Sequence, residues 1–195
     1  MTDLFQEPED ATPLEPEERE GLRLTWITTR ADLNLAEQDN IDKGAAWAFR
    51  AREPDLLTVE FVLQLHKRMF GDVWSWAGQY RRTERNIGIA PHMIGVQTTQ
   101  LMDDAAYWVA HKTYEPTELA VRVHHRLVYI HPFPNGNGRH ARMLADLVLR
   151  RLGAPALSWG GGSLDDINDL RRAYVEALRR ADRQDYGPLI AFARS

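Results

Sequence analysis

The sequence contains no cysteine, so it can form neither a disulfide framework nor a thiolate metal site. No apolar run approaches the roughly 18–20 residues that a membrane span needs, and the acidic N-terminus differs from a signal sequence. These absences predict a cytoplasmic protein without a membrane partner. A chain of 195 residues is long enough for one domain with a sizeable hydrophobic core.

Common metal and nucleotide motifs are absent as well. No His-Glu-x-x-His pattern occurs, and the adjacent His124 and His125 point to different faces of a helix, so we expect them to pack rather than bind metal. The glycines at 160–162 are not followed by Gly-Lys-Ser/Thr, which excludes a P-loop. The sequence also has no internal repeats and no low-complexity stretches.

Negative charge is concentrated at the start of the chain. Residues 1–20 hold eight acidic side chains and one arginine, so they contribute −7 to the net charge of −4 and the remaining residues carry +3. We expect this acidic, proline-containing stretch to be a solvated disordered tail, with coverage of a basic site as the alternative. The rest of the chain is too weakly basic to predict nucleic-acid binding from charge.

The spacing of apolar residues predicts an all-α helical bundle. Thr29, with Asp32 three residues later, is typical of a helix start, and Thr58 is expected to cap a second helix. Between residues 79 and 91, the turn formers Asn86 and Gly88 predict a short β-hairpin. Helices are expected over residues 29–50, 58–69, 96–112, 117–129, 138–152, 164–181 and 186–192.

Residues 131–142 are the most informative stretch of the chain and read His-Pro-Phe-Pro-Asn-Gly-Asn-Gly-Arg-His-Ala-Arg. A glycine loop that leads into a helix N-terminus directs unpaired backbone amides and the positive end of the helix dipole at an anion. Neighbouring arginines add bidentate phosphate recognition, and a histidine at the edge of the loop can take a proton near neutral pH. These features predict transfer of a phosphate-containing group.

The spacing His-x-Phe-x-x-Gly-Asn-Gly-Arg-x-x-Arg resembles the signature of the Fic (Fido-fold) family, whose members mostly transfer AMP from ATP to a hydroxyl of a target protein. The resemblance runs from about residue 55 to about residue 192 and is greatest to the branch called mobile mystery protein B. It includes Trp-Ala-Gly-Gln-Tyr-Arg at 76–81 and Tyr-Gly-Pro-Leu-Ile at 186–190. It implies a Fido-fold helical bundle with a small β-hairpin flap. We therefore expect a tail over residues 1–20, a helical extension over 21–54 and a Fic domain over 55–195.

The resemblance also implies a protein adenylyltransferase that uses ATP with Mg²⁺ and needs no organic cofactor. His131 matches the base that takes the proton of the target's Ser, Thr or Tyr hydroxyl. Asn135 stands where the family has an acidic residue that helps to hold Mg²⁺, so we expect weaker metal dependence, slower transfer or a changed reaction. The residues that match the nucleotide-phosphate site are Asn135, Gly136, Asn137, Gly138, Arg139 and Arg142.

Two further elements are carried over by their position. Ile87, Gly88 and Ile89 match a flap that clamps a target segment by backbone pairing, although a plain connecting hairpin would have the same sequence. Many relatives are inhibited by a glutamate that pairs with the second arginine of the motif. Its usual (Ser/Thr)-x-x-x-Glu-(Gly/Asn) motif is absent here, but Glu37 lies where N-terminal inhibitory helices occur. We hypothesise that Glu37 pairs with Arg142; a solvent-facing glutamate is the alternative.

Other functions stay open at this point. Asn135 leaves γ-phosphate transfer, as in a kinase, and removal of AMP as alternatives within the enzymes. A weakly catalytic nucleotide-binding module of the toxin–antitoxin type, with a separate antitoxin or regulator as partner, is an alternative from another class. A helical DNA-binding regulator is supported only by arginine pairs such as those at 150–151 and 171–172, which we expect to be solvated.

Overall fold

The computed structural model describes residues 14–50, 56–161 and 167–195, and within these ranges it is helical with a single isolated β-bridge. This confirms the predicted all-α fold. No helix in the described ranges is long and apolar enough to span a bilayer. The elements in chain order are α1 (Pro16–Arg19), α2 (Arg30–Arg50), α3 (Val59–Phe70), the 3-10 turn η1 (Pro91–Met93), α4 (Ile94–His111), α5 (Pro116–Ile130), α6 (Asn137–Arg151), α7 (Ile167–Ala181) and α8 (Gly187–Arg194).

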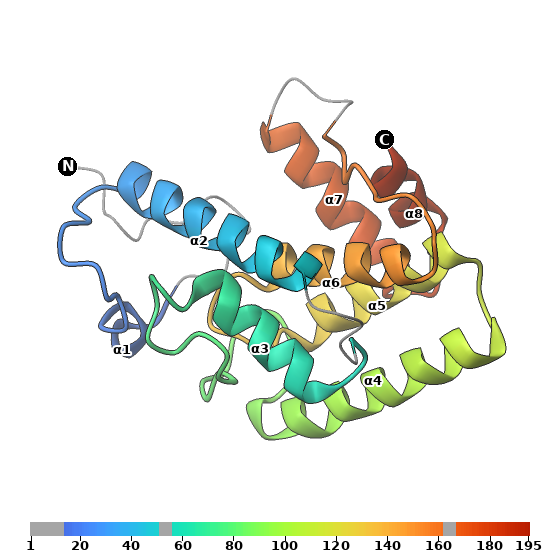
Figure 1. The fold of residues 1–195 in the computed structure, drawn as a ribbon, viewed down its shortest axis with the longest axis horizontal. Coiled ribbons are helices and arrows are strands. Elements are labelled where there is room, and N and C mark those ends of the chain that lie inside the picture. Colours follow the sequence, from blue (N-terminus) through green and yellow to red (C-terminus); the bar gives the residue numbers. More distant parts are fainter. Residues whose placement is uncertain (1–13, 51–55, 162–166) are drawn as a thin grey trace.

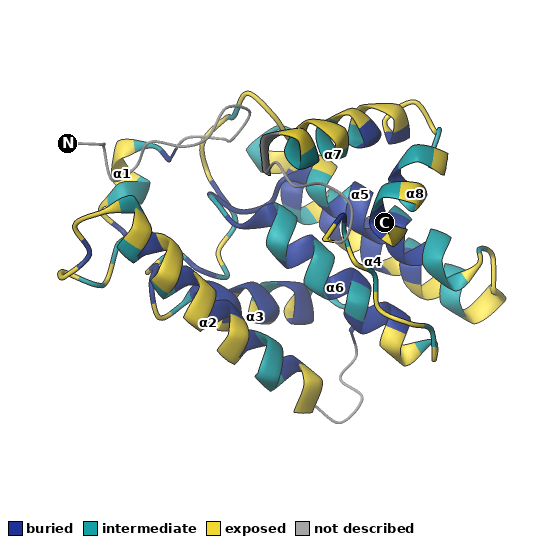
Figure 2. Cartoon of the chain, turned by 90° about the horizontal axis from the view of Figure 1, so that it is seen from above, coloured by how far each residue is buried: buried dark blue, intermediate teal, exposed yellow. Residues whose placement is uncertain are grey.

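Helices α5 and α6 form the centre of the molecule, and the other helices pack around them (Figure 1). Helix α3 packs against α6, and α2 packs along α3 and also contacts α6; α4 lies along α5, and α7 and α8 pack together beside α5. Burial follows this arrangement, because α5 and α6 are mostly buried while α2 and α4 expose one face to solvent (Figure 2). The connection between the two central helices is therefore held on several sides.

Local chemistry sets the helix starts that the sequence predicted. The Asp32 N–H donates to Thr29 Oγ1 over 3.1 Å and the Thr29 N–H donates to Asp32 Oδ2 over 3.0 Å, which is a reciprocal capping box at the start of α2. The Phe61 N–H donates to Thr58 Oγ1 over 3.2 Å at the start of α3. The helix predicted over residues 164–181 corresponds to α7, and its predicted start, at residues 164–166, lies outside the described residues.

Residues 79–90, which we call the flap loop, contain no paired strands, whereas the sequence predicted a hairpin there. Their two ends bond instead to the connection between α5 and α6. The Arg81 N–H donates to the Pro132 carbonyl over 2.9 Å, and the Ile89 N–H donates to the Ile130 carbonyl over 3.4 Å. Tertiary hydrogen bonds therefore replace the ladder that the local turn residues suggested.

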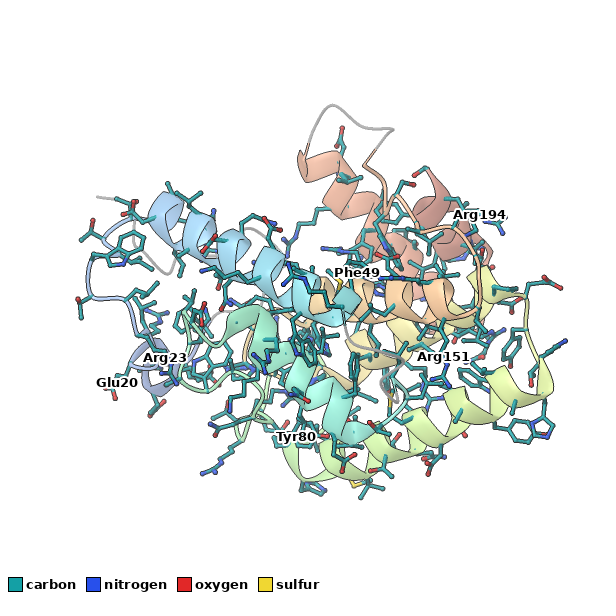
Figure 3. All side chains as sticks on the ribbon, in the orientation of Figure 1. Glu20, Arg23, Phe49, Tyr80, Arg151 and Arg194 are labelled. Atoms are coloured by element: carbon teal, nitrogen blue, oxygen red, sulfur yellow. The ribbon has the colours of Figure 1, made fainter. Side chains whose placement is uncertain are left out.

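The predicted disordered tail is partly ordered. Leu14 is buried, and α1 begins with a capping box between Glu15 and Glu18. Both carboxylates bind Arg85 of the flap loop, and the Trp76 Nε1–H donates to the Glu18 carbonyl over 2.9 Å. Glu20 and Arg23, labelled in Figure 3, mark where the chain leaves α1. Long-range ion pairs and a buried leucine thus order residues 14–20, which composition alone assigned to the tail.

The helical extension predicted for residues 21–54 is integrated into the bundle. Helix α2 packs along α3 and also contacts α6. Upstream of it, Leu22 forms an isolated antiparallel bridge with Trp74, and the Ser75 N–H donates to the Gly21 carbonyl over 2.8 Å. The predicted boundary with the Fic domain, at residues 54–55, lies outside the described residues.

Candidate active site

The site is built on the N-terminus of α6, which Gly136 caps. Gly136 has a φ of 80°, in the left-handed region that favours glycine. A Cβ atom at this position would lie 2.5 Å from the Phe70 ring, so the loop can approach α3 this closely only with glycine here. The first amides of α6 lack intrahelical acceptors, and this end of the helix is therefore suited to bind a phosphate.

Asn137 ties the loop to itself. Its Oδ1 accepts the Phe133 N–H over 2.9 Å, and its Nδ2 donates to the Phe133 carbonyl over 2.8 Å. Phe133 is fully buried, and its ring stacks on the imidazole of His66 with the ring centroids 3.7 Å apart. The residues from His131 to Gly136, here called the motif loop, are thus anchored to α3 through an aromatic side chain.

His66, on α3, binds the backbone of the motif loop directly. The Gly78 N–H donates to its Nδ1 over 3.0 Å, so the ring proton is on Nε2, which donates to the Asn135 carbonyl over 3.0 Å. Burial, with the nearby His140 and Arg139, holds the pKa of His66 well below its ordinary value. His66 is therefore neutral and fixes the position of the loop's polar backbone. Sequence reasoning missed it, because it lies 69 residues from its partner.

His131 lies at the junction of α5 with the motif loop. It is the C-cap of α5 with a left-handed φ of 53°, and its side chain is 8% exposed. Burial, reinforced by the charge of Arg81, lowers the pKa of His131 from 6.5 to about 4, with the Val128 carbonyl acting in the opposite direction. The imidazole is neutral at physiological pH, which is the form that can accept a proton.

The flap loop reaches this histidine through Gly88. A Cβ atom on Gly88 would lie 2.5 Å from the Cβ of His131, and the φ of Gly88 is +87°. Its neighbour Ile87 is 43% exposed, and Ile89 is partly buried against the main core. The structure therefore brings the residues that the sequence assigned to the flap into contact with the residue assigned as the base.

Arg139, in the first turn of α6, is paired with Glu37 of α2. Arg139 Nη1 donates to Glu37 Oε2 over 2.8 Å, and the Trp74 Nε1–H donates to Glu37 Oε1 over 2.7 Å. The Glu37 side chain is 2% exposed. The glutamate is therefore buried at the motif arginines, rather than facing solvent, and its partner is the first of them rather than the predicted Arg142.

Arg142, one turn after Arg139 on α6, lies against α7. Its guanidinium carbon is 5.6 Å from the centre of the Tyr174 ring. The Tyr174 hydroxyl lies 2.9 Å from His124 Nε2, and burial raises the pKa of Tyr174 to about 12. A Cβ atom on Gly138 would meet this hydroxyl at 3.8 Å, so Tyr174 borders the N-terminus of α6. No local sequence pattern points to Tyr174, because α7 reaches this place through tertiary packing.

Asn135 offers one neutral oxygen to a metal ion. Its Oδ1 accepts the Gly136 N–H over 2.5 Å, so coordination would replace this hydrogen bond. No group of three or more acidic, histidine or cysteine side chains suited to hold a metal occurs in the part of the chain that the structure describes. The donor set fits a Mg²⁺ ion that takes most of its ligands from phosphate oxygens and water and one from the amide.

Comparison with known proteins agrees with the motif and the fold. Residues 56–149 match the Fic/DOC family. The chain is 32% identical over 149 residues to the protein adenylyltransferase Fic of Nematostella vectensis, covering 72% of this chain and 32% of that protein. It is 32% identical over 150 residues to the protein adenylyltransferase fic-1 of Caenorhabditis elegans, covering 73% and 27%. The chain thus spans less than a third of the length of these curated relatives.

Solved structures show the same architecture. Fic-1 (residues 134–508) from C. elegans has a TM-score of 0.64 at 27% identity, covering 90% of this chain and 56% of that one. The BepC protein of Bartonella tribocorum, solved with bound AMPPNP, has a TM-score of 0.70 at 18% identity, covering 92% and 97%, and this likeness concerns the fold. The motif loop, the bundle around it and these matches show that the chain belongs to the Fic/DOC family.

Proposed function

We propose that this protein is a protein adenylyltransferase that moves AMP from ATP to a Ser, Thr or Tyr hydroxyl of a target protein. The observation that carries the proposal is the meeting of three elements at one place. A neutral, mostly buried His131 lies between Gly88 of the flap loop and the glycine-capped N-terminus of α6. The names of the curated relatives, protein adenylyltransferases, support the same reaction.

In the proposed step, the target's hydroxyl oxygen forms a bond to the α-phosphorus of ATP and its proton passes to His131. The bond from the α-phosphorus to the bridging oxygen breaks, and pyrophosphate leaves. Arg139, Arg142 and the first amides of α6 hold the phosphates and balance the charge that develops. The flap loop presents the target by backbone pairing, with the exposed Ile87 and the close Gly88 placing the hydroxyl beside the base.

Glu37 is the proposed inhibitor of this reaction. Its carboxylate occupies Arg139, a guanidinium that the phosphates of ATP require, so the nucleotide must displace it or bind without that contact. The Trp74 N–H holds the glutamate in place. Because Glu37 belongs to the chain itself, this inhibition acts in cis and requires no separate antitoxin.

Mg²⁺ is the proposed metal, and it reaches the site with the phosphates of ATP. It supplies charge neutralisation there, and the Asn135 amide oxygen is its protein ligand in this proposal. A neutral ligand binds the ion more weakly than a carboxylate does, so we expect a higher Mg²⁺ requirement than a protein with Asp at this position would show. The cytoplasm, where ATP, Mg²⁺ and protein targets are present, is the proposed site of action.

A labelling experiment tests the proposal. Cell lysate is incubated with the protein and ATP labelled at the α- or the γ-phosphate, beside His131→Ala. Label transferred from the α position, and lost in His131→Ala, supports AMP transfer. Label transferred from the γ position alone would make the protein a kinase. Binding of ATP without transfer from either position, in Glu37→Gly as well as in the parent protein, would support a nucleotide-binding module instead.

A further inference from the structure

Arg81 is a buried arginine at the root of the flap loop. It is 3% exposed, and within the described ranges it forms no ion pair. Its guanidinium is instead surrounded by backbone carbonyls. Nε donates to the carbonyl of His131 over 2.6 Å, Nη1 to that of Thr83 over 2.8 Å and Nη2 to that of Ile89 over 2.5 Å.

These acceptors belong to different parts of the site. Thr83 lies in the first half of the flap loop and Ile89 near its end, whereas His131 lies at the C-terminus of α5, beside Gly88. The planar guanidinium presents its donors in a fixed fork, so the positions of the acceptors are constrained relative to one another. A buried cation bonded to neutral carbonyls also keeps a positive charge close to the His131 ring.

Gly88 completes the junction. A Cβ atom at this position would lie 2.5 Å from the His131 side chain and 2.8 Å from Arg81 Nη2. The flap loop, the guanidinium and the histidine therefore meet without room for another carbon atom. A shift of the flap loop would have to move Arg81, and through it the backbone of His131.

We propose that Arg81 is a positioning residue that couples the flap loop to His131, so that the surface receiving the target and the base keep one relative geometry. This inference rests on the proposed function for its catalytic consequence, but the coupling itself is a property of the protein without substrate. The fork geometry and the charge make separable contributions. The geometry sets where the target hydroxyl lies, and the charge favours the neutral imidazole.

Two substitutions separate these contributions. Arg81→Lys keeps the charge and loses the fork, because an ammonium cannot reach three acceptors in one plane. Arg81→Gln loses the charge and most of the donors. Arg82→Gln is the matched control, since Arg82 is exposed and is not among the charges that lower the pKa of His131. Gly88→Ala disturbs the same junction from the flap side and serves as the second test where an Arg81 variant fails to fold.

The first measurement is NMR titration of His131 together with amide hydrogen exchange of the flap loop, neither of which needs activity. We expect Arg81→Gln to raise the pKa of His131, because it removes a nearby positive charge, and Arg81→Lys to change it little. Both variants, and Gly88→Ala, should speed exchange of the Ile89 amide. Arg82→Gln should change neither quantity. An unchanged His131 titration and unchanged flap exchange in Arg81→Gln would overturn the coupling.

The second measurement is steady-state kinetics with a labelled target. We expect Arg81→Lys to raise the KM for the target and to lower kcat by about tenfold or more, while the KM for ATP stays within about twofold. Equal losses for ATP and target would indicate a general structural role and contradict the proposal. If the parent protein transfers no AMP while the NMR coupling is present, the proposed function fails and the coupling stands.

Discussion

Two N-terminal helices, α1 and α2, each place glutamate against an arginine near the site, and the two contacts lie at different places. Glu37 of α2 binds Arg139 at the N-terminus of α6, where a phosphate would bind. Glu15 and Glu18 of α1 bind Arg85 on the flap loop. Under the proposed function the first contact would compete with the phosphates of ATP, whereas the second holds the loop that would receive the target. The same charge chemistry thus pairs a motif arginine at one place and anchors the flap loop at the other.

The two contacts differ in which partner is buried. The Glu37 side chain is 2% exposed and is held by an indole N–H as well as by Arg139, which is 35% exposed. At the other contact the arginine is the buried partner: Arg85 is 2% exposed, whereas Glu18 is 13% and Glu15 45% exposed. A buried charge is costly to leave without its partner. Loss of the arginine is therefore expected to cost more at Glu37 than at the two carboxylates of α1.

The largest expected loss of stability comes from removing the arginine of each contact, Arg139 or Arg85. We expect Arg139→Ala to lower the free energy of unfolding by about 3 kcal/mol, because it leaves the Glu37 carboxylate buried and unpaired. Arg85→Ala should cost less, about 2 kcal/mol, since Glu15 can turn to water and Glu18 keeps the Glu15 N–H as a partner. Denaturant unfolding measures both. Adding Glu37→Gln to Arg139→Ala should restore most of the loss, and a failure of this double variant to recover would show that the buried Glu37 charge is not the cause.

We expect acid to destabilise the packing of α3 against the motif loop and α6, because the buried neutral side chains of His66 and His140 hold these elements together. Burial lowers the pKa of His140 from 6.5 to about 4, and burial lowers that of His66 as well. The unfolded chain therefore binds more protons in this range, and stability present above pH 6.5 is lost as the pH falls towards 4.

Unfolding measured at a series of pH values tests this histidine effect. His140→Gln should reduce the loss between neutral pH and about pH 4 by about 3 kcal/mol, since folding lowers the pKa from 6.5 to about 4 and each pKa unit corresponds to about 1.4 kcal/mol. His92→Gln, at an exposed position, is the matched control and should leave the slope unchanged. Identical slopes for the parent protein and His140→Gln would contradict the prediction.

Neutralising the inhibitory carboxylate should raise nucleotide affinity. Glu37→Gln keeps an oxygen for the Trp74 N–H but loses the ion pair, so we expect ATP to bind about tenfold more tightly. Isothermal titration with a non-hydrolysable ATP analogue measures this change. Glu17→Gln, an exposed acid on α1, is the control. If Glu37→Gln binds ATP no better than the parent, the contact with Arg139 is structural rather than inhibitory.

A carboxylate at position 135 tests the proposed Mg²⁺ ligand. Asn135→Asp supplies a charged ligand for Mg²⁺, so we expect the Mg²⁺ concentration for half-maximal transfer to fall about fivefold. Flap exchange should not respond, because the flap loop does not bind this side chain. An unchanged Mg²⁺ concentration for half-maximal transfer would show that the neutral amide of Asn135 does not weaken Mg²⁺ binding. Asn137→Asp is not a suitable control, since Asn137 holds the motif loop together.

The smallest expected effect belongs to α1. Glu15→Gln removes only the more exposed of the two carboxylates on Arg85, and Glu18 stays paired, so it should lower the free energy of unfolding by less than about 1 kcal/mol. Amide exchange over residues 82–89 should nevertheless become faster, because the flap loop loses part of its contact with α1. Glu17→Gln removes the same charge from an exposed position and should leave exchange unchanged. Equal exchange in the two variants would show that Glu15 does not support the flap loop.

The sequence predicted the parts of the fold that local patterns determine. The spacing of apolar residues and capping residues such as Thr29 and Thr58 predicted where the helices lie. The fixed spacing of the motif predicted the position of the motif loop. It did not predict that Glu37 is buried on Arg139, because the Trp74 partner comes from a turn 37 residues away. The flap was predicted as a hairpin from its turn residues; the structure shows no paired strands there, and Arg81 bonds to the carbonyls of Ile89 in the flap loop and of His131, 50 residues along the chain.

The central claim, that the motif loop transfers AMP under the control of Glu37, is tested most directly on the Glu37→Gln background. Glu37→Gln and Glu37→Gln with His131→Ala are incubated with lysate and α-labelled ATP, and labelled protein is measured. We predict strong labelling of target protein by the single variant and none by the double variant. Equal labelling by both variants would contradict the role of His131, and no labelling by Glu37→Gln would contradict the account as a whole.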